Sequence, residues 1–238
     1  MRTGVPLGLL LALAAGPALA QAEDCYGFDA LGPDVALSVA AVTDAVPRVN
    51  FVKNGSAAKS CPSGREACRE RAFLVPGDIV VVSGTRGGFA CATYVNAKGL
   101  ARAGWLPLAA LRTEVEQPRV RMADWIGTWT APEQQITIKA GRGGLLDVEG
   151  EATFGALDPE RVKRGAINMG EVSGSAKPEG AILTFAMGDD DKTLPFDKGG
   201  EFDCRIRLRL VGSFLLAEDN QRCGGANVSF AGAYRRKK

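Results

Sequence analysis

Apolar and polar residues alternate one by one along several segments of this chain, and glycine-rich turns end most of these segments. In segment 204–211, arginine alternates with isoleucine and leucine at every second position. The three arginines are Arg205, Arg207 and Arg209. A period of two places successive side chains on opposite faces of a β-strand, and no segment has a convincing 3.6-residue period. The sequence therefore predicts an all-β protein, with these arginines facing solvent or forming a basic stripe for an acidic partner.

The first twenty residues have the layout of a cleavable secretory signal. Arg2 is followed by an apolar run over 7–15 and by small residues at Ala18 and Ala20. This run is too short to span a bilayer, which takes about 20 apolar residues. We expect cleavage near Ala20 and a periplasmic or secreted protein without stable membrane insertion.

The charge balance of the mature chain argues against a nucleic-acid partner. Of 29 Lys+Arg and 27 Asp+Glu, segment 1–20 contains only Arg2, which leaves 28 basic against 27 acidic residues. Nucleic-acid binders carry a basic surplus gathered on one face. The basic cluster at 235–238 is typical of a solvated tail, with contact to an anionic lipid or cell-wall polymer as the alternative.

Six cysteines in an exported chain indicate disulfides. They are Cys25, Cys61, Cys68, Cys91, Cys204 and Cys223. No pair has the two-residue spacing of a zinc knuckle, and the chain has no histidine to complete a metal site. The sequence predicts neither a metal nor another cofactor.

A charged stretch that contains Pro118 separates two regions rich in short apolar runs. The expected parts are a signal peptide (1–20), an N-terminal segment (21–44), a first domain (45–113), a linker (114–124) and a second domain (125–238). Because few apolar residues occupy the linker, we expect the two halves to fold independently.

Five short strands are expected in the first domain, at 49–52, 72–75, 78–83, 89–95 and 101–106. They suggest a small barrel. The stretch 73–82 (Phe-Leu-Val-Pro-Gly-Asp-Ile-Val-Val-Val), then Phe-Ala-Cys at 89–91 and Gly-Trp-Leu-Pro at 104–107, resembles a bacterial SH3-like (SH3b) domain.

That resemblance implies a peptide-binding groove. Trp105 and Pro107 would line it, with Phe89 and Tyr94 on a neighbouring strand, although Ala110 stands where peptide-binding SH3 domains place a tyrosine. The alternative is that Trp105 and Tyr94 are packing residues.

Eight strands are expected in the second domain: an opening segment at 124–129, then 135–139, 145–152, 168–175, 181–187, 204–211, 214–219 and 227–234. Asp158 and Pro159 predict one helical turn that ends at Arg164. An opening Gly-Thr-Trp and a closing Gly-Ala-Tyr-Arg are similar to the two ends of calycin barrels, the lipocalins and avidins. The resemblance implies that Trp129 closes the barrel base beneath Arg235.

The domain boundary divides the cysteines four and two, which leaves three possible connectivities. Cys204–Cys223 is expected in the barrel. Cys61 and Cys68 flank a Pro-Ser-Gly turn that favours their pairing, and Cys25–Cys91 would then remain.

The absence of histidine removes the commonest general base and the Ser-His-Asp and Cys-His nucleophiles. Three carboxylates alternate along one strand face, at Asp147, Glu149 and Glu151, and a spacing of about 7 Å would permit a glycosidase pair. A solvated strand face gives the same pattern and is the reading we favour. Asp189–Asp191 lacks the EF-hand spacing and is expected to be an acidic turn.

These observations predict a non-catalytic binding module of the cell envelope, with peptidoglycan or an envelope protein as its partner. The alternatives are an inhibitor of cell-wall hydrolases such as lysozyme, which would use loop 141–144 or 189–200, and a carrier of a small hydrophobic ligand. A carrier needs an open lumen, whereas five bulky side chains are available to fill it: Phe185, Met187, Leu208, Leu210 and Phe230.

Overall fold

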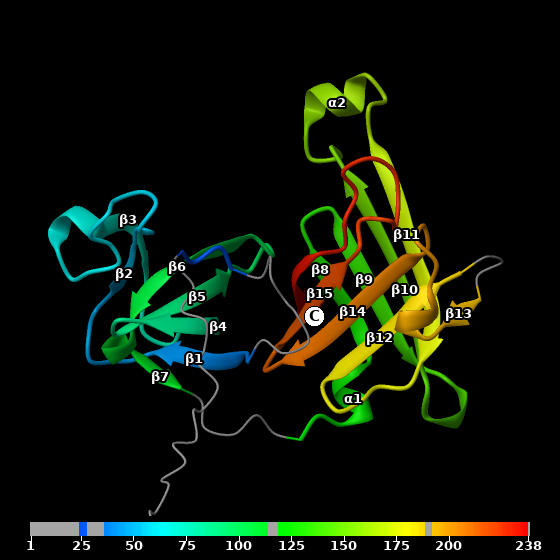
Figure 1. Cartoon of the computed structure of the whole chain (residues 1–238), viewed down its shortest axis with the longest axis horizontal. Coiled ribbons are helices and arrows are strands. Elements are labelled where there is room, and N and C mark those ends of the chain that lie inside the picture. The colour runs from blue at the N-terminus through cyan, green and yellow to red at the C-terminus, as the bar shows by residue number, and fades with distance from the viewer. Residues whose placement is uncertain (1–23, 28–35, 114–118, 189–191, 238) are drawn as a thin grey trace, which may run out of the picture.

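The computed structural model describes residues 24–27, 36–113, 119–188 and 192–237, so the expected signal peptide and the aspartates at 189–191 lie outside the described residues. Two antiparallel sheets are formed, a curled half-barrel of seven strands and then a nearly closed barrel of nine (Figure 1). The all-β class is confirmed. The strand numbers differ from the five and eight that the sequence analysis expected.

The half-barrel has the strand order β3-β2-β6-β5-β4-β1-β7. Its strands are β1 (Ser38–Val42), β2 (Val49–Val52), β3 (Arg69–Leu74), β4 (Ile79–Arg86), β5 (Phe89–Val95), β6 (Ala101–Pro107) and β7 (Leu111–Thr113). Short 3-10 turns, η1 (Glu66–Cys68) and η2 (Leu108–Ala110), precede β3 and β7. The expected N-terminal segment thus contains a strand, because β1 pairs with β4 on one side and with β7 on the other.

The inner face of the half-barrel packs on its own core, and the outer face packs against other parts of the chain. Val80, Ala92 and Leu106 point to its inside, where they meet Phe51 and Leu74 in a small core. Neighbouring residues on the same strands point outward and are buried by other parts of the chain. Both faces are therefore apolar, which explains the continuous apolar runs in β4 and β5.

The second sheet has the order β11-β10-β9-β8-β16-β15-β14-β12-β13. Its strands are β8 (Gly127–Ala131), β9 (Gln134–Ala140), β10 (Leu146–Phe154), β11 (Asn168–Ala176), β12 (Ile182–Met187), β13 (Thr193–Leu194), β14 (Cys204–Val211), β15 (Phe214–Asp219) and β16 (Gly232–Arg236). The described part of this domain also has the short helices α1 (Met122–Trp125), η3 (Arg142–Gly144), α2 (Pro159–Lys163) and η5 (Phe196–Lys198). The two ends of the sheet meet where the backbone N–H of Ser175 donates to Thr193 Oγ1 over 2.8 Å.

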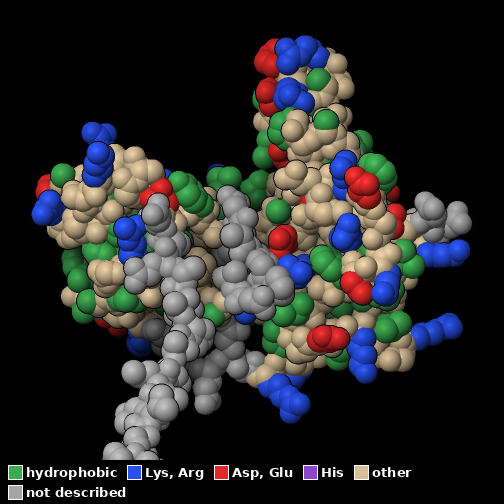
Figure 2. Space-filling view, in the orientation of Figure 1, with side chains coloured by type: hydrophobic (Ala, Val, Ile, Leu, Met, Phe, Trp, Pro, Cys, Tyr) green, Lys and Arg blue, Asp and Glu red, His purple; other side chains and the backbone are tan. Residues whose placement is uncertain are grey.

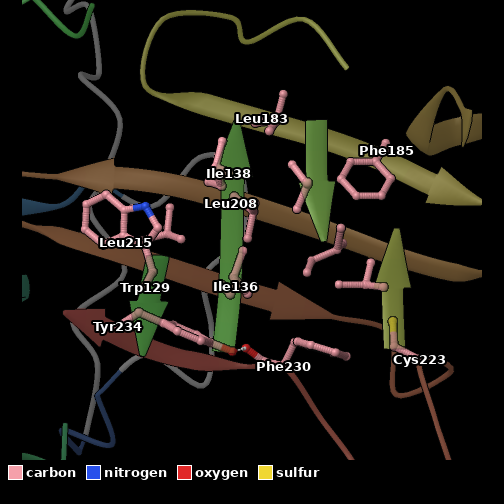
Figure 3. Packing of buried hydrophobic residues seen from close by; sticks show 14 of the residues in the cluster. Trp129, Ile136, Ile138, Leu183, Phe185, Leu208, Leu215, Cys223, Phe230 and Tyr234 are labelled. Atoms are coloured by element: carbon pink, nitrogen blue, oxygen red, sulfur yellow. Dashed lines mark hydrogen bonds between the residues drawn. The ribbon is translucent and has the colours of Figure 1, made fainter. Parts of the chain in front are cut away.

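Side chains fill the inside of the barrel (Figure 3). Phe185, Leu208, Leu210 and Phe230 are at most 3 % exposed, and Met187 packs against them. The buried Tyr234 hydroxyl donates to the backbone oxygen of Phe230 over 2.7 Å. These bulky residues lie where the sequence analysis placed them.

The last strand begins later than expected, at Gly232 instead of residue 227. The carboxylate of Asp219 accepts from the hydroxyl of Ser229 over 2.8 Å and from the backbone N–H of Phe230. Asn227 also has a φ of 65°, which a strand does not allow. Local hydrogen bonds therefore hold residues 227–231 as a loop.

An apolar interface joins the half-barrel to the barrel. Its buried side chains are Leu37, Val39, Val81 and Val95 on the half-barrel and Val211, Phe214, Leu216 and Ala233 on the barrel. Strand β15 is buried on both faces, since Leu215 and Ala217 face the barrel core while Phe214 and Leu216 face the half-barrel. The contact is made by sheet faces and not by the linker, and the sequence analysis considered the linker alone.

Three disulfides are formed among the described residues: Cys25–Cys91, Cys61–Cys68 and Cys204–Cys223. These are the pairs that the sequence analysis favoured. They indicate an oxidising compartment outside the cytoplasm. Within the described ranges, no helix has the length and apolar character needed to cross a membrane.

Candidate functional site

The four residues expected to line a groove do not share a surface. Strands β5 and β6 are paired so that Phe89 lies opposite Pro107 and Cys91 lies opposite Trp105. Phe89, Trp105 and Pro107 therefore share one face of the sheet with Cys91. Tyr94 lies on the other face, where it packs against the small inner core. Among these aromatic and proline side chains, Phe89, Tyr94 and Pro107 are half-buried. The structure therefore brings Phe89, Trp105 and Pro107 onto one face and leaves Tyr94 on the other.

Trp105 is a core residue and not an exposed hot spot. Its side chain is 0 % exposed and packs with Cys25, Cys61 and Cys68 on the outer face of the half-barrel. The Cys25–Cys91 disulfide holds the start of the described chain over this face. Of the two readings of Trp105 in the sequence analysis, this placement agrees with the packing residue, because the cross-linked segments cover the indole.

The three alternating carboxylates lie on the outer face of β10, and two of them have partners. Asp147 accepts from the Ser175 hydroxyl over 2.6 Å, and Glu149 forms an exposed ion pair with Lys139 at 2.9 Å. Glu151 is exposed. No group of three or more potential metal ligands is found within the described ranges. This arrangement is that of a solvated strand face.

The arginine ladder on β14 is engaged with the protein itself. Arg205 donates to the backbone oxygen of Gly200 over 3.2 Å. Arg207 pairs with Glu218 at 3.0 Å, and its guanidinium lies 5.0 Å from the ring centroid of Phe196. Desolvation lowers the pKa of Arg209. These guanidinium groups are thus not a free basic stripe.

A protruding hairpin, which we call the arm, extends from the barrel (Figure 1). It consists of the ends of β10 and β11 and the connection 155–167, which includes α2. Its strands stay paired as far as Phe154 and Asn168, two residues beyond the last pair of β10 with β9. The arm was missed by the sequence analysis, which chose loops 141–144 and 189–200. In the described part of loop 189–200, strand β13 pairs with β12 and the turn η5 packs against it.

Hydrogen bonds and a ring contact hold the arm in shape. A carboxylate oxygen of Glu133, in the β8–β9 turn, accepts from the backbone N–H of Ala156 and, over 3.2 Å, from that of Leu157. Asp158 caps α2, as expected, by accepting from the backbone N–H of Glu160 over 2.9 Å. The Arg161 guanidinium lies 4.7 Å from the ring centroid of Phe154. The arm is therefore held in shape by contacts within the chain itself.

Apolar side chains on this arm are left open to solvent. Leu157 is 68 % exposed, Met169 70 % and Val162 47 %. Lys163 and Glu160 lie beside them as an ion pair, and Figure 2 shows apolar, basic and acidic side chains together on the protrusion. The sequence signal was available, since Leu157 directly precedes the turn that Asp158 and Pro159 begin and Val162 lies within it, among charged residues and without any period that would bury them.

A cavity of about 570 Å³ lies at the other end of the barrel, near α1. Linker residues 119–121, Asp124 and the turn between β14 and β15 surround it, and Trp129 and Leu210 form its floor. Hydrogen bonds from Arg121 keep the pKa of the Asp124 carboxyl below its usual value. The rim therefore carries an ionised carboxylate that is already paired.

The two arginines of β16 have different roles from those expected. Arg236, and not Arg235, lies over Trp129, with its guanidinium carbon 4.7 Å from the ring centroid. Arg235 stacks on Phe214 at 4.8 Å and donates from Nε to the backbone oxygen of Val95 over 3.0 Å. Alternation explains the exchange, because Tyr234 and Arg236 share the face that looks toward the barrel interior, whereas Arg235 looks toward the half-barrel.

Comparison of the chain with models of known families, with curated proteins and with solved structures finds no match in any of the three. Any functional assignment therefore depends on the geometry described above.

Proposed function

We propose that this chain is an exported, non-catalytic binding protein whose arm contacts a protein partner. The observation that carries this proposal is the exposure of Leu157 and Met169 on a pre-ordered protrusion. Large apolar side chains that nothing covers mark interaction sites, and a surface ordered in advance loses little conformational entropy on binding.

The arm favours a protein over the glycan of the cell wall. Its tip is aliphatic, which suits insertion into an apolar pocket of a partner. A flat sugar ring would need an exposed aromatic face, and the side chains exposed on the arm are aliphatic, whereas the exposed aromatics Tyr26, Phe73 and Phe202 lie elsewhere on the molecule. Peptidoglycan remains the other partner to test.

An inhibitor of cell-wall hydrolases is the second candidate. A convex, ordered protrusion has the shape that fills an enzyme cleft, and such complexes form with little backbone movement. The proposal also retains the resemblance of the half-barrel to SH3-like domains and of the barrel to calycins. In this proposal both are scaffolds, and the filled barrel interior argues against a carrier.

The test is to pull down partners from periplasmic extract with the mature protein, in parallel with binding to sacculi. The variant L157S/M169S should lose at least tenfold of its affinity for the captured protein. The control L100S/L108S removes two exposed leucines from the half-barrel, at 53 % and 40 % exposure, and should bind like the unmodified protein. Equal binding by both variants would contradict the role of the arm.

Hydrolase assays separate the two candidates. If the protein inhibits lysozyme or another wall hydrolase and L157S/M169S does not, the inhibitor assignment holds. Capture without inhibition supports a binding partner of another kind. Binding to sacculi that survives L157S/M169S overturns the protein-partner proposal.

A further inference from the structure

The cavity near α1 has an apolar floor and a basic rim. Val120, Trp129 and Leu210 lie at the floor, where Val120 is half-buried and Trp129 and Leu210 are 2 % and 3 % exposed, and the exposed turn at Gly212 and Ser213 forms one wall. Its volume of about 570 Å³ is within the range of roughly 300–1,000 Å³ that small-molecule sites occupy. The cavity is separate from the arm, which lies at the opposite end of the barrel (Figure 1).

The rim holds three arginines and one carboxylate. Arg121 and Asp124 neutralise each other at 2.9 Å. Arg236 is fixed over Trp129 and donates to the backbone oxygen of Asp124, so its position is set, and the Asp124 carboxylate that it shares with Arg121 cannot neutralise both guanidinium groups. Arg119 makes no hydrogen bond or ion pair within the part of the chain that the structure describes. Two positive charges thus remain beside apolar surface.

We propose that this cavity binds a single-chain amphiphile with an anionic head group. The acyl chain lies against Val120 and the few exposed atoms of Trp129 and Leu210, and the head group accepts hydrogen bonds from Arg119 and Arg236. Both features are needed, because an apolar molecule without charge leaves the two guanidinium groups unpaired, and a small anion leaves the floor in contact with water.

Calorimetric titration of the mature protein with laurate, below its micelle-forming concentration, tests the proposal. We expect saturable binding that weakens as salt is added, because the head-group contacts are partly exposed. Dodecanol, dodecyltrimethylammonium and acetate should each bind at least tenfold more weakly, since each lacks one of the two features. Dodecyl phosphate, compared with laurate, tells whether the head group is a phosphate or a carboxylate.

Variants locate the binding. R119Q/R236Q should lower the affinity for laurate at least tenfold, and S213W should fill the cavity from an exposed turn and block binding. The control R222Q removes an arginine that stacks on the exposed Phe202 in another loop, and its affinity should not change. Thermal unfolding verifies that each variant is folded. No saturable binding of laurate, equal binding of dodecanol, or unchanged affinity in both cavity variants overturns the proposal.

Discussion

The seven-stranded half-barrel carries two of the three disulfides, whereas the nine-stranded barrel carries one. The half-barrel, which has more disulfides, has the smaller hydrophobic core. Among the described residues, nine buried side chains form the inner core of the half-barrel, and twenty form that of the barrel. Small cores give little stability on their own, and cross-links commonly compensate. The comparison indicates that the half-barrel depends on its disulfides and on its neighbour, while the barrel depends on packing.

Dependence on the neighbour can be tested at Leu216, which is 0 % exposed and faces the half-barrel. L216D buries an unpaired carboxylate in the apolar interface and should lower the free energy of unfolding of the whole chain by about 5 kcal/mol. In the isolated fragment 120–238, the half-barrel is absent, so residue 216 is exposed to solvent. There L216D should be nearly neutral and should improve solubility.

Urea unfolding of the full chain and of the fragment 120–238, each with and without L216D, measures this difference in the free energy of unfolding. A140D, on the exposed end of β9, is the control and should cost less than about 1 kcal/mol in both contexts. If L216D costs the same in the fragment and in the full chain, the interface contributes nothing and the halves are independent after all.

The disulfides should contribute unequally. In the loop-closure model, stabilisation grows with the length of chain enclosed, and the separations are 66, 19 and 7 residues. Replacing Cys25 and Cys91 by alanine should therefore cost about 4 kcal/mol, against about 3 for Cys204 and Cys223 and about 2 for Cys61 and Cys68. Urea unfolding gives the order. A larger loss from the barrel pair than from Cys25–Cys91 would reverse the comparison.

The smallest expected effects are at Arg235 and Arg236. R235Q removes the donor to the backbone oxygen of Val95, a residue that is 0 % exposed, and should cost about 2 kcal/mol. R236Q removes the contact of an exposed arginine with the Trp129 ring and its exposed hydrogen bond to the backbone oxygen of Asp124, and should cost about 0.5–1 kcal/mol. Chemical denaturation distinguishes them. Equal losses would mean that Arg235 does not join the two halves.

Much of the fold could be predicted because alternation and turn residues are local signals. Segment 204–211 is β14, the capped turn at Asp158 is α2, and two of the disulfides close short loops. β1 was missed because the sequence Ser-Val-Ala-Ala-Val shows no alternation. That lack of alternation has a physical cause, since Val39 packs on the barrel while Ala40 packs inside the half-barrel.

The candidate sites could not be predicted in the same way. Whether Trp105 is exposed depends on Cys25, which lies far away in the sequence, and the cavity depends on linker residues that meet the base of the barrel. The interface between the half-barrel and the barrel can, however, be recognised in the sequence. Phe214–Ala217 is a continuous apolar run on a strand whose neighbour β14 alternates, and such a run indicates burial on both faces.

The nesting of one disulfide inside another affects how the chain matures. During synthesis Cys25 is followed by Cys61 and Cys68 before Cys91 is made, although Cys91 is its partner. Any bond between Cys25 and one of the two intervening thiols must be undone by thiol–disulfide exchange before the half-barrel is complete. Cys204 and Cys223 are consecutive, so the barrel can oxidise correctly in order of appearance. Loss of a disulfide isomerase would thus trap the first half of the molecule and spare the second.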